Sequence, residues 1–303
     1  MRPTVMCVTF FAEVSADQHA ANASRGMLKS ILLCLESAEQ ATPVIDFGVA
    51  LAKTTGARVR GLTLVDTRRF EEAQVCESAV YLSMVSTRHA VTETIHEGAH
   101  KELSRLCLKA KLDFDVRRTS GNPLEVLPAE SRFHDLTIIS IEKLDHRLAP
   151  GLAQVALSLT DMLQLLRRGM QPLLVMPARP RQIERVLLVY DGTEASGRAI
   201  RSFLSLGVMR EAECRLLAIG RDENQSRLML AEMAEYCASH IPGIEMGYAA
   251  GKVRRVLMSY AKKWEADMLV LGAGRSHGWV QRLAGRASLD MATALECALF
   301  VHT

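Results

Sequence analysis

The sequence lacks the features that mark several large protein classes. None of its apolar runs approaches the ~18 residues that a helix needs to cross a bilayer. Its seven cysteines are odd in number, irregularly spaced and without a CxxC pair, which disfavours a disulfide scaffold or a zinc cluster and favours a reducing cytoplasm. A net charge of +3 is too small to indicate binding to nucleic acid or to an anionic membrane. We therefore expect a cytoplasmic protein with neither of those partners.

The sequence also contains little that indicates catalysis. It has no GxSxG motif, and its scattered Ser, Cys and His residues form no triad that a sequence can support. The stretch HEGAH, from His96 to His100, fits the HExxH pattern, in which two histidines share a helix face and bind zinc. Gly98 weakens such a helix and no clear third ligand follows, so we predict a solvated helical face, no metal site and no catalytic residue.

Length and composition indicate two globular domains. At roughly 100–200 residues per domain, a chain of 303 residues suggests two. A hydrophobic share of 49% and a charged share of 23% are enough for buried cores and argue against disorder. Residues 1–28 start with a short apolar patch followed by polar residues, which is too weak for a signal peptide. We expect these residues to form a poorly ordered leader.

The rest of the chain repeats itself. SILLCLESAEQA, from Ser30, matches RVLLVYDGTEAS, from Arg185. In order along the chain, GARVRGLTLVD then matches EAECRLLAIGRD, RTSGNPLEVL matches YAAGKVRRVL, HDLTIIS matches ADMLVLG, and QPLLVMP matches CALFVHT. Five apolar runs thus recur in the same order, each short and rich in Val, Ile and Leu, as strands buried on both faces are.

Helical patterns separate these runs. In the first of them, Thr42 is a plausible N-cap and Pro43 a plausible first helical residue. Alternating strands and helices predict an α/β fold with two tandem doubly wound domains, the first over 29–178 and the second over 184–303. The first half has additional sequence between its second and third runs, which we expect to form a lengthened helix or a helical hairpin.

Polar residues follow three strands of the second half. Ligands of an open parallel sheet bind at the carboxyl ends of its strands. There the first strand ends at Asp191, the third near Gly251, and the fourth runs into Gly272. The Asp191 carboxylate could accept a hydrogen bond from a sugar hydroxyl, or could cap the next helix together with Thr193, and the two roles are compatible.

A glycine-rich loop, GAGRSHGWVQRLAG, begins at Gly272. Glycines let backbone N–H groups face a phosphate, and the helical pattern after Gly285 would add the N–H groups of a helix start. The spacing fits neither the Rossmann fingerprint nor the Walker motif, because no Lys-Ser/Thr pair follows the last glycine.

These residues resemble the universal stress protein family in its tandem two-domain form, over nearly all of 29–303. The family signature is an Asp at the end of the first strand and Gly-x2-Gly-x9-Gly-(Ser/Thr) after the fourth. Asp191 matches the first element, and Gly272 and Gly285 keep the required separation. Arg275 replaces the middle glycine and Arg286 replaces the Ser/Thr.

The resemblance implies a five-stranded parallel sheet in each domain, of the adenine nucleotide alpha hydrolase-like type. It also implies ATP binding in the second domain, with Mg²⁺ as an additional ligand and at most slow hydrolysis. Val189 and Ile219 would flank the adenine, and Gly274 would serve in place of the missing glycine. The residues expected to bind the nucleotide are Val189, Asp191, Thr193, Ile219, Gly251, Gly272, Gly274, Arg275, Gly285 and Arg286.

The first domain departs further from the signature. Glu36 replaces the Asp, Ser140 stands where Gly272 stands, and Leu159 occupies the position of the last glycine. We expect no ATP site of the usual kind in this domain.

Two alternatives remain for the whole chain. It could be an interaction or dimerisation module that binds no nucleotide, or a sensor in which Arg275 and Arg286 bind another anionic small molecule. In either case the terminal strands QPLLVMP and CALFVHT are expected to pair with each other or with a second chain, since an apolar edge strand invites pairing.

Overall fold

The contacts of the chain, seen in a computed structural model, divide it into two compact units. The first unit holds Lys29–Gln171 and Val175–Ala178, and the second holds Arg179–Thr303 with Pro172–Leu174 and Met1–Leu28. No helix within the described parts is long and apolar enough to cross a membrane. The structure describes residues 6–8, 28–35, 38–67, 79–141, 164–165, 168, 172–177, 179, 181–209, 211–220, 222–273 and 296–302.

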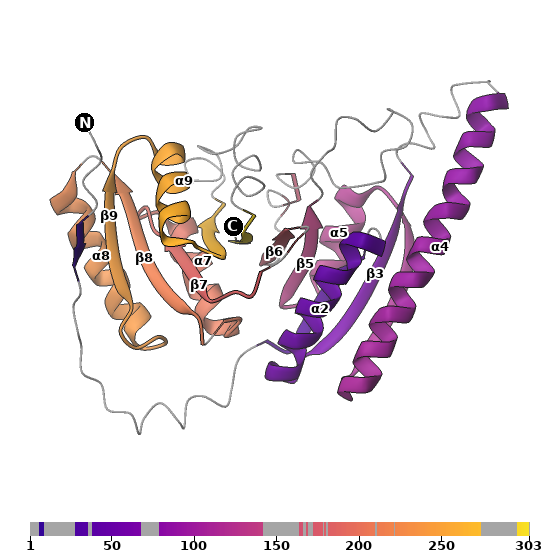
Figure 1. Cartoon of the computed structure of the whole chain (residues 1–303), viewed down its shortest axis with the longest axis horizontal. Coiled ribbons are helices and arrows are strands. Elements are labelled where there is room, and N and C mark those ends of the chain that lie inside the picture. The colour runs from indigo at the N-terminus through magenta and orange to yellow at the C-terminus, as the bar shows by residue number, and fades with distance from the viewer. Residues whose placement is uncertain are drawn as a thin grey trace. The chain divides into compact units, whose positions relative to one another are not determined.

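The first unit is built on strands in the order β6-β5-β2-β3-β4 (Figure 1). Strand β2 pairs in parallel with both β3 and β5, and β3 pairs in parallel with β4. Helix α4 covers one face of β3, where a Cβ on Gly61 would lie 2.3 Å from Leu103. Helix α5 covers the other face, where its Glu130 lies 4.0 Å from Arg60. The elements are β2 (Ser30–Cys34), α2 (Ala38–Thr55), β3 (Arg58–Asp66), α4 (Ala79–Ala110), β4 (Phe114–Gly121), α5 (Pro123–Ser131), β5 (Leu136–Ile141) and β6 (Leu173–Pro177).

The second unit repeats this arrangement. Its strands run in the order β9-β8-β7-β10-β11, and each of these neighbouring pairs is parallel. A short strand near the N-terminus, β1 (Met6–Val8), adds an antiparallel neighbour to β9. The other elements are β7 (Arg185–Val189), α7 (Glu194–Leu206), β8 (Glu213–Gly220), α8 (Glu223–Ala238), β9 (Glu245–Ala250), α9 (Val253–Trp264), β10 (Met268–Gly272) and β11 (Ala298–His302).

The strands and helices confirm the predicted doubly wound α/β fold. Central strands are buried on both faces, and Val186 to Val189 of β7 are each 0% exposed. The additional sequence of the first half includes one long helix, α4, of 32 residues. The predicted start of α2 at Thr42 and Pro43 is wrong, because this helix begins earlier, at Ala38, and holds Pro43 in its interior.

In each unit, one aspartate joins the amino ends of the first and fourth strands. Asp135 Oδ2 accepts hydrogen bonds from the backbone N–H groups of Lys29 and Ser30, at 2.8 and 2.9 Å. In the second unit Asp267 Oδ2 accepts from Glu184 and Arg185, both at 3.0 Å. Each aspartate lies just before the fourth strand of its unit and binds the start of the first. The two strands are therefore held in register at their amino ends.

Replacing Asp267 with alanine should remove both of these acceptors at once. We expect the free energy of unfolding of the second unit to fall by roughly 1–3 kcal/mol, since backbone N–H groups lose charge-assisted partners. Denaturant unfolding followed by circular dichroism would measure the loss. Asp267→Asn keeps one carbonyl oxygen and should lose less, and equal stability of all three proteins would contradict this role.

Candidate functional site

The end of β7 forms a tight turn into α7. Gly192 has a φ of 76°, in the left-handed region, and a Cβ there would lie 2.6 Å from the sulfur of Met229 on α8. Thr193 is the N-cap of α7, and its side chain accepts a hydrogen bond from the Ser196 backbone N–H at 3.3 Å. The capping role belongs to Thr193 and leaves Asp191 for another task.

Asp191 is held by this turn through one of its two oxygens. Oδ1 accepts three hydrogen bonds, from Thr193 N (3.1 Å), Thr193 Oγ1 (2.6 Å) and Ser196 Oγ (2.7 Å). The residue is half-buried, and Oδ2 makes no hydrogen bond within the described residues. The carboxylate is thus oriented in advance, with one oxygen left to accept a ligand hydroxyl or to contact a cation.

Gly272 ends β10 directly beside this turn. A Cβ on it would lie 2.2 Å from the Ser196 backbone N and 2.3 Å from the Ala195 carbonyl carbon. Only glycine allows β10 to approach the first turn of α7 this closely. The chain winds from β7 to β9 in one direction and through β10 and β11 in the other, so Asp191 and Gly272 meet at the point where the strand order switches.

The other predicted site residues lie near the same edge or outside the described chain. Val189 and Ile219 are near the carboxyl ends of β7 and β8, and are 0% and 8% exposed. Gly251 follows β9 with a φ of 136°, and its Cβ would lie 2.9 Å from Val256, so this glycine is needed by the backbone itself. Four of the predicted site residues, in the glycine loop and just after it, lie outside the described residues: Gly274, Arg275, Gly285 and Arg286.

Sequence reasoning missed Ser196. It is 0% exposed, and its Oγ accepts a weak hydrogen bond from Asp191 N at 3.4 Å. Its single hydroxyl proton is shared between Asp191 Oδ1 at 2.7 Å and the Thr193 carbonyl oxygen at 2.9 Å. Its spacing from Thr193 was the available signal, because a serine three residues after an N-cap lies over the helix start. Ser196 thus ties Asp191, the cap and the close approach of Gly272 into one structure.

Comparison with known proteins identifies the fold. No family model and no curated protein matches the sequence. A universal stress protein from Archaeoglobus fulgidus DSM 4304 is similar with a TM-score of 0.64 at 14% identity, over 90% of this chain and 96% of its own. The chain has the universal stress protein fold. A protein of unknown function from Pseudomonas aeruginosa PAO1 is similar with a TM-score of 0.58 at 15% identity, over 91% and 93% of the two chains.

The first unit of this universal stress protein fold uses its corresponding edge differently. Ser140, at the position of Gly272, is buried, and its hydroxyl donates to the Met176 carbonyl at 3.4 Å. The Ser140 side chain therefore contributes to the contact between β5 and β6. Glu36 and Leu159 lie outside the described residues.

The two histidines of the HEGAH motif are buried while Glu97 and Gly98 are exposed, so the predicted solvated helical face is wrong for the histidines. His96 and His100 are 5% and 6% exposed on the side of α4 that faces the sheet. Arg118 Nε donates to His100 Nδ1 at 3.3 Å, which places the ring proton on Nε2, facing Thr63 Oγ1 at 3.1 Å. Burial lowers the pKa of His100, and the Arg118 charge lowers it further.

This arrangement assigns the motif a structural role. A His100 ring that donates from Nε2 cannot take a proton from Thr63, so the pair is not an activated nucleophile. Among the described residues, no group of three His, Cys, Asp or Glu side chains could hold a metal ion. The sequence could not reveal this burial, because α4 is not strongly amphipathic and its buried side depends on β3.

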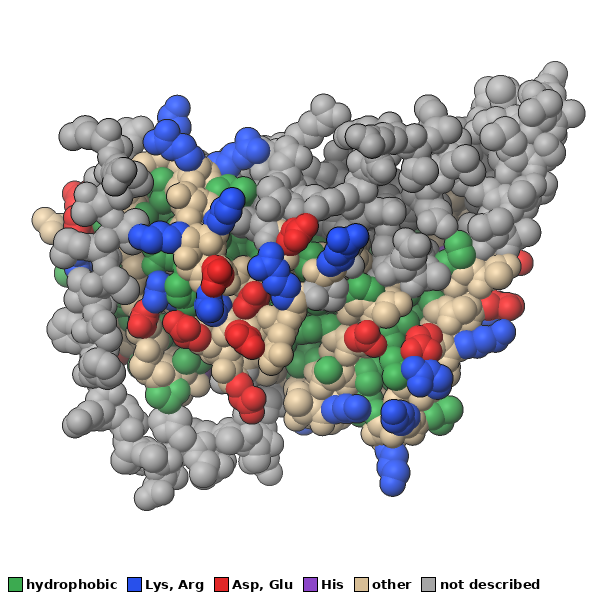
Figure 2. Space-filling model, viewed as in Figure 1, with side chains coloured by type: hydrophobic (Ala, Val, Ile, Leu, Met, Phe, Trp, Pro, Cys, Tyr) green, Lys and Arg blue, Asp and Glu red, His purple; other side chains and the backbone are tan. Residues whose placement is uncertain are grey.

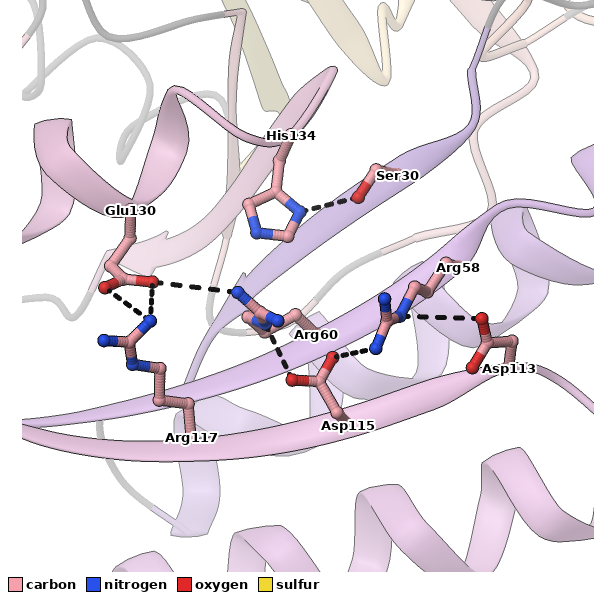
Figure 3. Close-up of polar contacts among 8 residues, drawn as sticks. All are labelled: Ser30, Arg58, Arg60, Asp113, Asp115, Arg117, Glu130 and His134. Carbon is pink, nitrogen blue, oxygen red and sulfur yellow. Dashed lines mark hydrogen bonds and ion pairs between the residues drawn. The ribbon is translucent and has the colours of Figure 1, made fainter.

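A second polar cluster of the first unit lies at the amino ends of its strands (Figure 3). Arg60 pairs with Asp115 on the neighbouring strand at 2.8 Å, and Arg117 pairs with Glu130 of α5 at 3.1 Å. His134 is 7% exposed, and its Nδ1 lies 2.7 Å from Ser30 Oγ. Burial, together with the nearby Arg60, lowers the pKa of His134 to about 4. The cluster balances its charges internally, which suits a structural role.

Proposed function

We propose that the second domain, over 184–303, binds ATP or a related adenine nucleotide at the carboxyl ends of its strands. The observation that carries the proposal is the Asp191 carboxylate, fixed through Oδ1 by Thr193 and Ser196 with Oδ2 left to a ligand. In this role Oδ2 accepts a hydrogen bond from a ribose hydroxyl. The close approach of Gly272 keeps the turn in place.

The remaining contacts follow from the resemblance to the universal stress protein signature. Val189 and Ile219 flank the adenine, and the loop that starts at Gly272 faces the phosphates. Arg275 and Arg286 supply charge-assisted contacts where the signature has glycine and a hydroxyl. A Mg²⁺ ion would be held by the phosphates and water, because the Asp191 carboxylate is already used by the turn and by the ribose hydroxyl.

The first unit, over 29–178, supports this function without a nucleotide of its own. Ser140 is committed to the backbone of β6, where the second unit has Gly272. We further propose that β6 and β11 are the strands through which the units pair, with each other or with a second chain. The protein binds rather than catalyses. The five cysteines whose side chains the structure describes are all buried and outside any disulfide, which suits a cytoplasmic protein.

Nucleic acid is not favoured as a partner of this chain. Figure 2 shows basic and acidic side chains interspersed over the described surface on the face it draws. Binding to nucleic acid needs a basic patch or stripe that neutralises several phosphates.

Replacing Asp191 with alanine tests the proposal. Because a hydrogen bond to a charged group contributes about 1.5–3 kcal/mol, ATP affinity should fall roughly 10- to 100-fold or below detection. Isothermal titration of both proteins with ATP measures the change. Asn122→Ala is the matched control, because Asn122, like Asp191, accepts a hydrogen bond from the backbone N–H two residues ahead of it, but at the start of α5 in the other unit. Its loss should leave ATP affinity unchanged. Equal affinity of the Asp191→Ala and parent proteins would contradict the assignment.

A further inference from the structure

The outer strand of the second unit, β9, is covered by β1. In the antiparallel pairing Met6 lies opposite Tyr248, Cys7 opposite Gly247 and Val8 opposite Met246. All other pairings described for this unit are parallel. The covering strand has three residues and β9 has six, so the cover is short.

The corresponding edge strand of the first unit, β4, is protected from pairing in another way. Among the described residues, β4 pairs with β3 alone. It carries Asp115, Arg117 and Arg118, and the two arginine side chains are 53% and 56% exposed. Charged side chains on an edge strand oppose pairing with another chain. The edge of β4 is thus protected by its own sequence.

Strand β9 has no such protection beyond its first residue. Glu245 is paired with Arg215 on β8, and the residues from Met246 to Ala250 are all uncharged. Tyr248 is 8% exposed, and its hydroxyl donates to the Gly220 carbonyl at 3.2 Å, so this side chain is held within the unit. The other side of β9 is paired with β8, so its outer edge becomes an open template for pairing when β1 does not occupy it.

We propose that the β9 edge is a strand-pairing site that β1 keeps closed, and that a second copy of this chain pairs through its own β9 when β1 leaves. The edge accepts an antiparallel neighbour, and two identical strands related by a two-fold axis are antiparallel. No like charges would face each other between Met246 and Ala250, whereas two β4 strands would oppose their arginines. The proposal is independent of nucleotide binding.

Deleting residues 2–9 tests this site. Sedimentation velocity over a range of concentrations should show the shortened chain doubling its mass relative to the full chain measured alongside. A mass equal to that of the full chain at every concentration would overturn the proposal. The matched control adds Met246→Lys to the deletion, which places a charge on the exposed edge and should return the mass to that of the full chain. Equal association with and without the lysine would show that β9 is not the interface.

A second variant keeps the test valid if the shortened chain does not fold. Cys7→Pro in the full chain removes a backbone N–H from β1 and should cause the same doubling. A synthetic peptide of residues 1–12, added in excess, should reverse it, and the same peptide with proline at position 7 should not. Failure of the unmodified peptide to compete, in a variant that associates, would contradict the covering role of β1.

Discussion

Replacing Gly272 with alanine should destabilise the second unit by about 3 kcal/mol or more. The added Cβ would lie 2.2 Å from the Ser196 backbone N and 2.3 Å from the Ala195 carbonyl carbon. These are backbone atoms at the first turn of α7, so no side chain can rotate to make room. Inserting a methyl group into a packed site usually costs about 1–3 kcal/mol, and contact with backbone places this case at the upper end or beyond. Chemical denaturation would measure the loss.

The control for this substitution lies in the same helix. A Cβ on Gly197 of α7 would meet only side-chain atoms, at 3.7 Å or more, which is ordinary contact. Gly197→Ala should therefore be neutral or stabilise the unit by up to about 1 kcal/mol, because alanine favours a helix interior. If Gly272→Ala proved as stable as Gly197→Ala, the close approach of β10 to α7 would not be required for the fold.

Acidification should destabilise the protein through His134. Burial and Arg60 lower the pKa of this histidine from 6.5 to about 4, so the folded chain stays neutral at His134 where the unfolded chain has bound a proton. The free energy of unfolding should therefore be retained above pH 6.5 and decrease as the pH falls towards 4. The total decrease assigned to His134 is roughly 3 kcal/mol.

The variant His134→Asn isolates this effect. An asparagine can keep the hydrogen bond to Ser30 Oγ but does not titrate. Between pH 6.5 and 4, the free energy of unfolding of His134→Asn should therefore decrease by roughly 3 kcal/mol less than that of the parent. Ser30→Ala removes the partner and leaves the histidine buried, so the dependence should remain in this control. His302 of the second unit has a pKa lowered to about 4 and is present in all three proteins, so the comparison excludes its contribution. Equal slopes for His134→Asn and the parent would contradict the account.

Much of the fold could be predicted because strands buried on both faces leave a strong sequence signal. Runs such as Val186 to Val189 need no knowledge of their neighbours, and their recurrence in order indicated two similar sheets. Asp191 could be placed for the same reason, since it follows such a run directly. Gly272 could be assigned to the same edge, but not its contact with Ala195 and Ser196, because that depends on how closely α7 approaches β10.

Other features depend on residues far apart in the chain and left no local signal. Asp135 and Asp267 were aligned by the repeat, yet their role depends on backbone N–H groups at a distant strand start. The burial of His96 and His100 depends on β3, which α4 does not specify through its own pattern. The start of α2 was misplaced because Pro43 favours a first helical turn only when no earlier residues extend the helix.

The most direct test of the central claim is the analysis of small molecules released from the natively purified protein, followed by titration with ATP. We expect an adenine nucleotide in at most equimolar amount, or binding heat when the ligand-free protein is titrated, and binding weakened roughly 10- to 100-fold or lost in Asp191→Ala. A parent protein that releases no nucleotide and gives no heat at millimolar ATP would contradict the claim.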